Sequence, residues 1–375
     1  MRTTITFFLL LTGLIINAAA QVQRPEKIHL GLVYPLSSNG RNAPLDTNNL
    51  SIQLIAGVSA SEQGLAFAGL SNVVRRDSRA MLFAGFSNHV FEKAEGAQFA
   101  GFMNTYRSGR GAAFSGFANI ATQEVIGGQF AGFLNTSGNL KGAQFAGFAN
   151  VADSVKGAQF AGFANVARNN ITESQFAGFI NVAQDVDGAQ LAGFINVARK
   201  VKGAQLAGFI NIADSSDCPL GIINIIKNGE KGIGTTFDDS QTGMLSFRSG
   251  GKVLYGIIGA GYNFRNVDEV YAFEAGFGAH LLRFNPFRLN IEAVASTLES
   301  FKEGEFFKSS IRVMPAVKIT PWLEIFGGPS FNYISTNTIE GITHKDKYQR
   351  EWSNKWGNDF QAIYFGYQGG LQILF

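Results

Sequence analysis

The final residues of the chain alternate between apolar and polar or small positions, the period-two pattern of a strand with two different faces. One face carries the apolar side chains and one glycine: Ile363, Phe365, Tyr367, Gly369, Leu371, Ile373 and Phe375. Glycine, glutamine and Tyr364 occupy the other face. Segments around residues 271–281, 288–296 and 307–319 repeat the alternation, with Glu, Arg, Lys or His on the polar face. We therefore predict antiparallel strands with one apolar and one polar or charged face over residues 227–375.

Residues 60–226 follow another pattern, about eleven copies of a unit that repeats every 15 or 16 residues. The fullest copy, residues 157–167, reads Gly-Ala-Gln-Phe-Ala-Gly-Phe-Ala-Asn-Val-Ala. Each copy is too short and too rich in Gly and Phe for a helix, so we predict extended strands in which the recurring glycine marks a bend or a close backbone approach. The Gly and Asn residues that define the unit include Gly85, Asn88, Gly101, Asn104, Gly147, Asn150, Gly162, Asn165, Gly178, Asn181, Gly193, Asn196, Gly208 and Asn211.

The charges of the repeats lie apart from these motifs, because every ionised side chain between Ala97 and Ala213 falls in a connector. Two all-β architectures accommodate such units. In a β-solenoid each unit is one coil, and identical residues stack at about 4.8 Å. In the alternative, one large β-barrel includes the repeats as membrane strands. Membrane barrels alternate short turns with longer loops, whereas these connectors are nearly uniform, which favours the solenoid.

Two further segments, residues 27–36 and 49–59, precede the repeats, and we predict that they are strands of the same barrel as the C-terminal strands. The barrel then uses residues 21–59 and 227–375, in about 8–12 strands, with the solenoid-like region inserted between them. Tight junctions near Ser249, Asn285 and Thr320 alternate with longer polar links. If the barrel has about ten strands, the repeats begin on the same side of it as the N-terminal end of the first strand. One strand fewer near residues 230–248 would reverse that side.

Residues 1–20 have the composition of a secretory signal peptide. Arg2 precedes an apolar stretch over residues 5–16, and the small residues Ala18, Ala19 and Ala20 follow it. The apolar stretch is too short to span a membrane, so we predict cleavage before Gln21 and export from the cytoplasm.

Composition excludes several protein classes. Of 375 residues 46% are hydrophobic, which is too apolar for a disordered chain. A single cysteine, Cys218, excludes a disulfide scaffold, and no long apolar run after residue 20 suggests a membrane helix. A net charge of +3 gives no nucleic-acid signature. The excess of Gly (45) and Phe (35) comes largely from the repeats and the alternating strands.

Motifs for chemistry are absent from the sequence. The four histidines have no metal-ligand spacing, and Ser87 and His89 have no identifiable carboxylate partner. We therefore predict no catalytic residue, no cofactor and no metal. Charged residues on the polar faces of the C-terminal strands are expected to fill a small barrel: Glu274, His280, Glu292, Lys308 and Arg312.

Two resemblances add to this interpretation. The terminal strand, with Tyr367, Leu371, Ile373 and Phe375 on one face, resembles the last strand of bacterial outer-membrane β-barrel proteins. The Phe-Ala-Gly-Phe-x-Asn motif, as in residues 145–150, resembles the bacterial surface-repeat protein family over residues 60–226. These resemblances imply a non-enzymatic outer-membrane protein with a structural or adhesion-like role. The expected partners are outer-membrane lipid and a protein or glycan, with the repeats surface-exposed or periplasmic. An outer-membrane pore or transport barrel is the alternative.

Overall fold

The computed structural model describes residues 27–302, 304–342, 347–353 and 360–375, so the predicted signal peptide lies outside the described residues. The chain divides into two compact units, Met1–Arg107 and Ser108–Phe375. Both are built almost entirely of strands, as the sequence predicts. No helix among the described residues is long and apolar enough to cross a membrane.

The first unit consists of stacked parallel coils. Strand β1 (Ile28–Val33) forms a short antiparallel pair with β2 (Leu36–Ser37), and the 3-10 helix η2 (Gly40–Leu45) follows. Strand β3 (Thr47–Ser59) pairs in parallel with β1, with β4 (Ser61–Ala68) and with β5 (Ser71–Val74). Strands β6 (Met81–Ala84) and β7 (Ser87–Ala100) continue the same parallel stacking. The prediction that residues 21–59 supply barrel strands is therefore wrong over the described residues, because β1 stacks in parallel on β3, and β3 stacks in parallel on the coils of the repeats.

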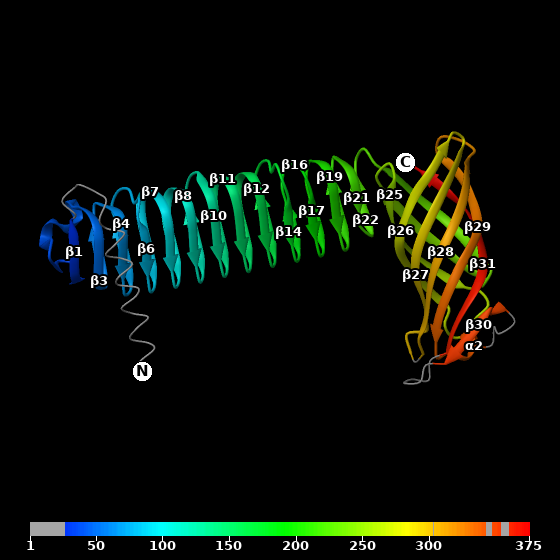
Figure 1. The fold of residues 1–375 in the computed structure, drawn as a ribbon. Coiled ribbons are helices and arrows are strands. Elements are labelled where there is room, and N and C mark those ends of the chain that lie inside the picture. The colour runs from blue at the N-terminus through cyan, green and yellow to red at the C-terminus, as the bar shows by residue number, and fades with distance from the viewer. Residues whose placement is uncertain (1–26, 303, 343–346, 354–359) are drawn as a thin grey trace. The chain divides into compact units, whose positions relative to one another are not determined.

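The second unit begins with further coils of the same kind (Figure 1). Equivalent positions of successive coils pair in register, as in Asn135 with Asn150 and Gln144 with Gln159. This confirms the β-solenoid and excludes the single large barrel. The strands of these coils are β8 (Met103–Ser115), β9 (Ala118–Ala121), β10 (Val125–Ala131), β11 (Leu134–Ala146), β12 (Ala149–Ala161), β13 (Ala164–Ala167), β14 (Gln175–Ala177), β15 (Ile180–Val182), β16 (Asp185–Asp187), β17 (Gln190–Ala192), β18 (Ile195–Val197), β19 (Lys200–Ala207), β20 (Ile210–Ala213), β21 (Ser215–Leu220) and β22 (Ile223–Ile226).

An aliphatic column fills one part of the interior of these coils. Its side chains come from the connector side of each repeat and are almost fully buried: Val125, Leu140, Val155, Ile171, Val186 and Val201. Each stacks on the equivalent residue of the next coil, so every repeat buries its apolar face only against its neighbours. The rest of the interior holds buried alanines such as Ala152 and Ala167 together with the buried asparagines and glutamines of the repeat.

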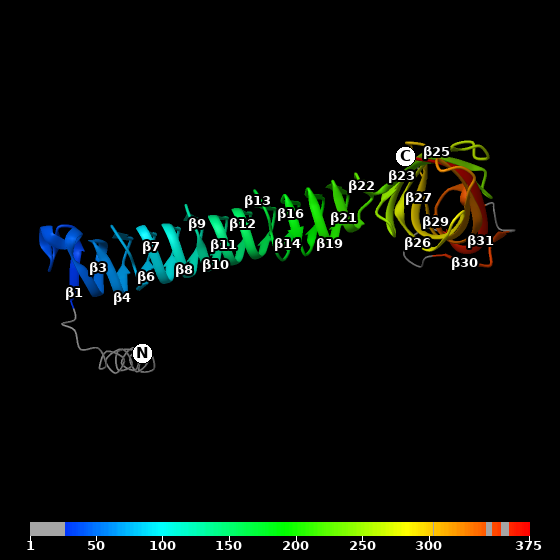
Figure 2. The ribbon, with the colours of Figure 1, turned by 90° about the horizontal axis from the view of Figure 1, so that it is seen from above.

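The rest of the second unit is an antiparallel barrel. Its strands are β23 (Glu230–Asp238), β24 (Thr242–Gly250), β25 (Leu254–Asn263), β26 (Tyr271–Phe284), β27 (Phe287–Glu299), β28 (Phe306–Lys318), β29 (Leu323–Thr336) and β31 (Phe360–Leu374). Each pairs with the next, and β23 pairs with β31, so the sheet closes into the ring seen in Figure 2. Eight strands close this barrel, within the predicted range but below the count near ten. They are consecutive in the chain, so the expectation that the repeats are inserted into the barrel is wrong.

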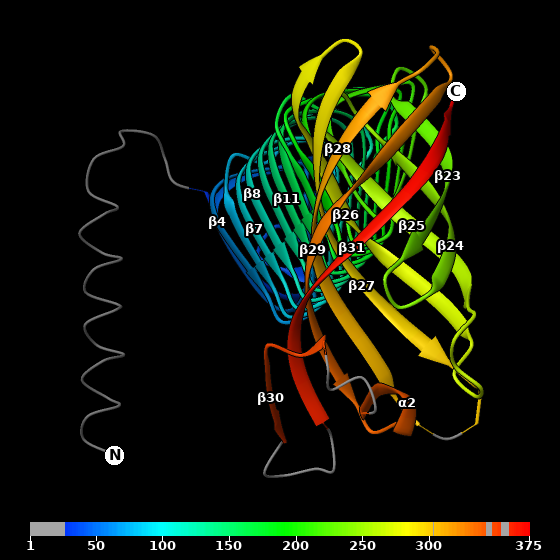
Figure 3. The ribbon, with the colours of Figure 1, turned by 90° about the vertical axis from the view of Figure 1, so that its right-hand side faces the viewer.

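The two ends of the barrel differ. One end has the short turns after β24, β26 and β28, together with the start of β23 and the end of β31. The opposite end has one short link, residues 239–241, and the longer links 264–270 and 300–305. It also carries α2 (Ile339–Ile342) and β30 (Arg350–Ser353), which pairs with β31 (Figure 3). The chain leaves the coils at Ile226 and enters the barrel at Glu230, so it enters through the end with the short turns.

Candidate functional site

The outer wall of the barrel is apolar. On the terminal strand β31, Tyr367 is 71% exposed, and Leu371, Ile373 and Phe375 face outward with it. Gln368 and Gln372, on the alternate positions, are buried inside. Other strands contribute large exposed apolar side chains to the same wall: Ile233, Phe237, Leu245, Tyr271, Phe273, Phe277, Phe307, Ile311, Val313, Ile325, Phe331 and Phe365. The predicted orientation of the terminal strand is therefore confirmed, with its apolar side chains on the outside of the barrel.

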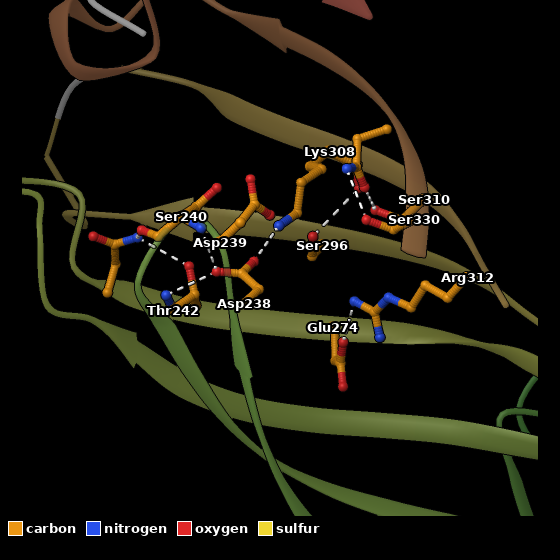
Figure 4. A network of polar contacts seen from close by, with 12 residues as sticks. Asp238, Asp239, Ser240, Thr242, Glu274, Ser296, Lys308, Ser310, Arg312 and Ser330 are labelled. Atoms are coloured by element: carbon orange, nitrogen blue, oxygen red, sulfur yellow. Dashed lines mark hydrogen bonds and ion pairs between the residues drawn. The ribbon is translucent and has the colours of Figure 1, made fainter. Parts of the chain in front are cut away.

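The interior of the barrel is charged. The Arg248 Nε lies 2.9 Å from Glu292 Oε1, and the Arg288 Nε lies 2.6 Å from Glu324 Oε2. Figure 4 shows two further pairs in a second part of the interior, Lys308 with Asp238 at 2.7 Å and Arg312 with Glu274 at 2.9 Å. Each of these four pairs joins strands that are not neighbours in the sheet, so the ion pairs bridge the lumen.

These ion pairs fill the lumen. Burial of an unpaired charge is costly, so the arginines and glutamates of a small barrel interior satisfy one another. Cavities of about 10 and 20 Å³ remain between the described side chains, enough for about one water molecule each. The predicted interior position of Glu274, His280, Glu292, Lys308 and Arg312 is confirmed.

Sequence reasoning missed half of the charged partners. Asp238, Arg248, Arg288 and Glu324 also take part in the interior pairs. Arg288 lies on a polar face that the alternation identified, but the alternation near 230–248 is weaker, because Gly, Ser and Thr occupy many of its inward positions. If the small polar residues of this segment are assigned to the inward face, the alternation of every second residue also places Arg248 inside the barrel.

The asparagines of the repeat form a continuous ladder of side-chain amides. Asn135 Nδ2 donates to Asn150 Oδ1 at 2.9 Å, and Asn150 Nδ2 donates to Asn165 Oδ1 at 3.0 Å. The same Nδ2 of Asn150 donates to the carbonyl oxygen of Phe160 at 2.7 Å. The ladder continues through fully buried asparagines: Asn181, Asn196, Asn211 and Asn224. In the first unit, Asn72 and Asn88 make the same contacts, and Asn104 Oδ1 accepts from Asn88 Nδ2.

A parallel ladder of glutamines and a column of glycines complete each coil. Gln144 Nε2 donates to Gln129 Oε1 at 2.7 Å, and Gln159 Nε2 donates to Gln144 Oε1 at 2.8 Å. A Cβ atom on Gly162 would overlap the carbonyl oxygen of Gly147 in the preceding coil. The predicted close backbone approach at the recurring glycine is thus confirmed.

The repeat phenylalanines form two stacked rows beside these glycines. In the second unit they are Phe114, Phe130, Phe145, Phe160 and Phe176 in one row and Phe117, Phe133, Phe148, Phe163, Phe179, Phe194 and Phe209 in the other. Successive ring centroids lie 4.7–5.1 Å apart with nearly parallel planes. The rings remain partly exposed to solvent, with Phe163 40% exposed. We call these two rows the aromatic edge.

The connectors carry the charges of the coils away from the aromatic edge. Arg168 forms an ion pair with Asp153 at 2.9 Å, and Lys141 forms one with Glu124 at 2.7 Å. All four side chains are more than 40% exposed, so such pairs contribute little to stability. Each coil therefore has an apolar aromatic edge and a charged connector edge.

The last coil packs against the outer wall of the barrel within the second unit. Asn224, the final member of the asparagine ladder, donates from Nδ2 to the carbonyl oxygen of Ser249 at 2.9 Å. Its backbone N–H donates to Ser249 Oγ at 2.9 Å. A Cβ on Gly256 of β25 would overlap the carbonyl oxygens of Gly221 and Ile222. The barrel thus satisfies the end of the ladder, a capping role that solenoids require.

Ser87 and His89 each contact a different side chain of a neighbouring coil. His89 Nδ1 lies 2.7 Å from Thr105 Oγ1, and Ser87 Oγ lies 3.1 Å from Ser71 Oγ, so the structure does not bring Ser87 and His89 together. Burial lowers the pKa of His89. Among the described residues no group of three or more His, Cys, Asp or Glu side chains is arranged to hold a metal ion.

Glu62 is the main buried carboxyl group of the first coils. Its Oε1 accepts hydrogen bonds from Ser51 Oγ at 2.8 Å and from Asn48 Nδ2 at 3.1 Å. Burial raises the pKa of this carboxyl group, although the hydrogen bonds act in the opposite direction. Glu62, Asn48 and Ser51 are all buried, and the second carboxyl oxygen of Glu62, Oε2, has no hydrogen-bond partner among the described residues.

Comparison of the chain with protein-family models, with curated proteins and with solved structures found no match in any of the three.

Proposed function

We propose that this chain is a non-enzymatic bacterial outer-membrane protein, in which the barrel is the anchor and the coils form a structural or partner-binding domain. The observation that carries the proposal is the polarity of the barrel, with Tyr367 and Leu371 outward and Glu292 and Arg312 inward. A barrel in water places its apolar side chains inside, whereas a barrel in lipid places them outside. Closure also leaves no unpaired strand edge in the membrane.

The ion pairs in the lumen support an anchor over a pore. Arg248 with Glu292 and Lys308 with Asp238 cross the space that a solute would need. Barrels of eight strands have an interior that side chains can fill. We therefore do not retain the pore or transport barrel as a second candidate.

The ends of the barrel support a side for the coils. Outer-membrane barrels have short turns on the periplasmic side and longer loops outside. The chain passes from Ile226 into Glu230 at the end with the short turns, so we propose that the coils are periplasmic. The Phe-Ala-Gly-Phe-x-Asn motif supports placing the chain with the bacterial surface-repeat proteins, and a protein or glycan of the envelope is the expected partner.

Charge placed on the barrel wall tests the proposal. Leu245 lies near the middle of β24 and is 56% exposed, whereas Ile319 lies at a short turn and is 57% exposed. In lipid vesicles, Leu245→Arg should lower the free energy of unfolding by about 2–4 kcal/mol, and Ile319→Arg by about 0–1 kcal/mol. Urea titration followed by tryptophan fluorescence measures both. Equal and small effects would show that the wall does not face lipid.

A further inference from the structure

The aromatic edge is an unusual surface for a protein domain in water. The longer row, Phe117 to Phe209, extends for about 30 Å at the spacing of stacked strands. Outward positions beside it are also apolar, such as Ile180, Val182 and Ile195. Single exposed apolar residues are ordinary, but a continuous stripe of this length indicates a surface that is covered in the native setting.

The last coil joins the stripe to the barrel wall. In this coil Gly221 and Ile222 take the places of the glycine and the second phenylalanine of the repeat. Gly221 and Ile222 contact Gly256 on the outside of β25. Ile222 also lines a groove of about 590 Å³ on the barrel wall, together with Ala275, Phe277, Ala293, Ile311 and Phe331. The aromatic edge is therefore continuous with the apolar outer wall of the barrel.

The connector edge of the coils is polar, as an element lying at a membrane surface requires. The connectors carry exposed ion pairs such as Arg168 with Asp153, while the motif cores between Ala97 and Ala213 carry no ionised side chain. An element with one apolar and one charged side lies in the interface of a bilayer with its apolar side in the acyl region. Stacked phenylalanines supply that side here.

We infer that the aromatic edge is inserted into the hydrocarbon of the same membrane leaflet that surrounds the short-turn end of the barrel. This inference rests on the proposed function, because the barrel wall must itself face lipid. The coils would then be a second, half-inserted membrane element with their connectors in water. The asparagine and glutamine ladders make this insertion feasible, because they satisfy the amides of the interior within the protein.

Fluorescence at single cysteines measures the depth of each position. We use the mature full-length chain with Cys218→Ser and add, one at a time, Phe148→Cys, Phe163→Cys, Lys156→Cys or Leu245→Cys. Each protein is labelled with an environment-sensitive dye and placed in vesicles that contain lipids with a quencher on the acyl chain. Retention of the heat-dependent gel mobility typical of folded barrels checks that each variant is folded.

The expected result is strong quenching at positions 148, 163 and 245, with at least threefold weaker quenching at position 156 on the charged edge. Quenching at 245 without quenching at 148 and 163 would overturn the inference and leave the proposed function standing. If the dyes at positions 148 and 163 are shielded from water only at high protein concentration and are not quenched by lipid, a second copy of the chain covers the aromatic edge. That result would also overturn the inference. Absence of quenching at all four positions would remove the inference and the proposed function together.

Discussion

Replacing Gly162 with alanine should unfold the coils around it, with a loss of about 3 kcal/mol or more. The added Cβ overlaps the carbonyl oxygen of Gly147, and a backbone atom held by two neighbouring coils cannot rotate away. The same clash would occur at Gly147 and Gly178, so the requirement comes from the stacking and not from one local turn. Thermal unfolding followed by circular dichroism measures the loss.

Gly128→Ala is the matched control for Gly162→Ala. Gly128 pairs with Ala112 and Ala143, so both adjacent coils already carry alanine at this position, and its added Cβ would meet side-chain atoms of Phe130 but no backbone atom. This change should alter stability by less than about 1 kcal/mol. Equal destabilisation by both variants would show that the glycine column is not a close backbone contact.

Replacing Asn150 with leucine should be as damaging. The variant removes the Nδ2 donor from Asn165 Oδ1 and from the carbonyl oxygen of Phe160, in a fully buried site. Each unsatisfied buried group costs about 1–3 kcal/mol, so we expect a loss of about 3 kcal/mol or more. Urea unfolding measures it, and the barrel, followed by its gel mobility, should remain folded because each coil contacts only its neighbours.

The isosteric variant Asn150→Asp separates shape from hydrogen bonding. It keeps an acceptor for Asn135 but brings a carboxylate into a buried site, which raises its pKa above the value in the unfolded chain. Because the folded state then binds more protons, stability should fall as pH rises from about 4 to 7. Asn170→Asp, at an exposed connector position, should show almost no such dependence. A pH-independent loss at Asn150 would contradict the ladder.

The repeat and the alternation predicted both parts of the fold for physical reasons. When identical residues recur every 15 or 16 positions, each can pair with the same residue of the next coil, as Gln144 does with Gln159. Alternation predicted which side of β31 is apolar. The prediction for the N-terminal strands was wrong because residues 49–59 have a sequence pattern that suits a strand of a coil as well as a strand of a barrel. Only the strand with which they pair, here β4, distinguishes the two.

Pairing across the barrel could not be predicted from the sequence. Asp238 and Lys308 are 70 residues apart and lie on strands that are not adjacent, so no local pattern links them. The side of the membrane also depended on the strand count, which changed when β1 and β3 proved to be part of the coils. The excess of phenylalanine in the repeats is evident from the sequence. That the rings are partly exposed follows only from the structure, in which the asparagines and glutamines occupy the interior of the coils.

Labelling from outside the cell tests the central claim most directly, which is that the barrel spans the outer membrane with its coils on the periplasmic side. With Cys218→Ser, Asp268→Cys places a thiol in the exposed link 264–270, and Lys156→Cys places one in a coil connector. In intact bacteria a membrane-impermeant maleimide should label the Asp268→Cys protein and leave the Lys156→Cys protein unlabelled until the outer membrane is opened. Labelling of the Lys156→Cys protein in intact cells would contradict the account.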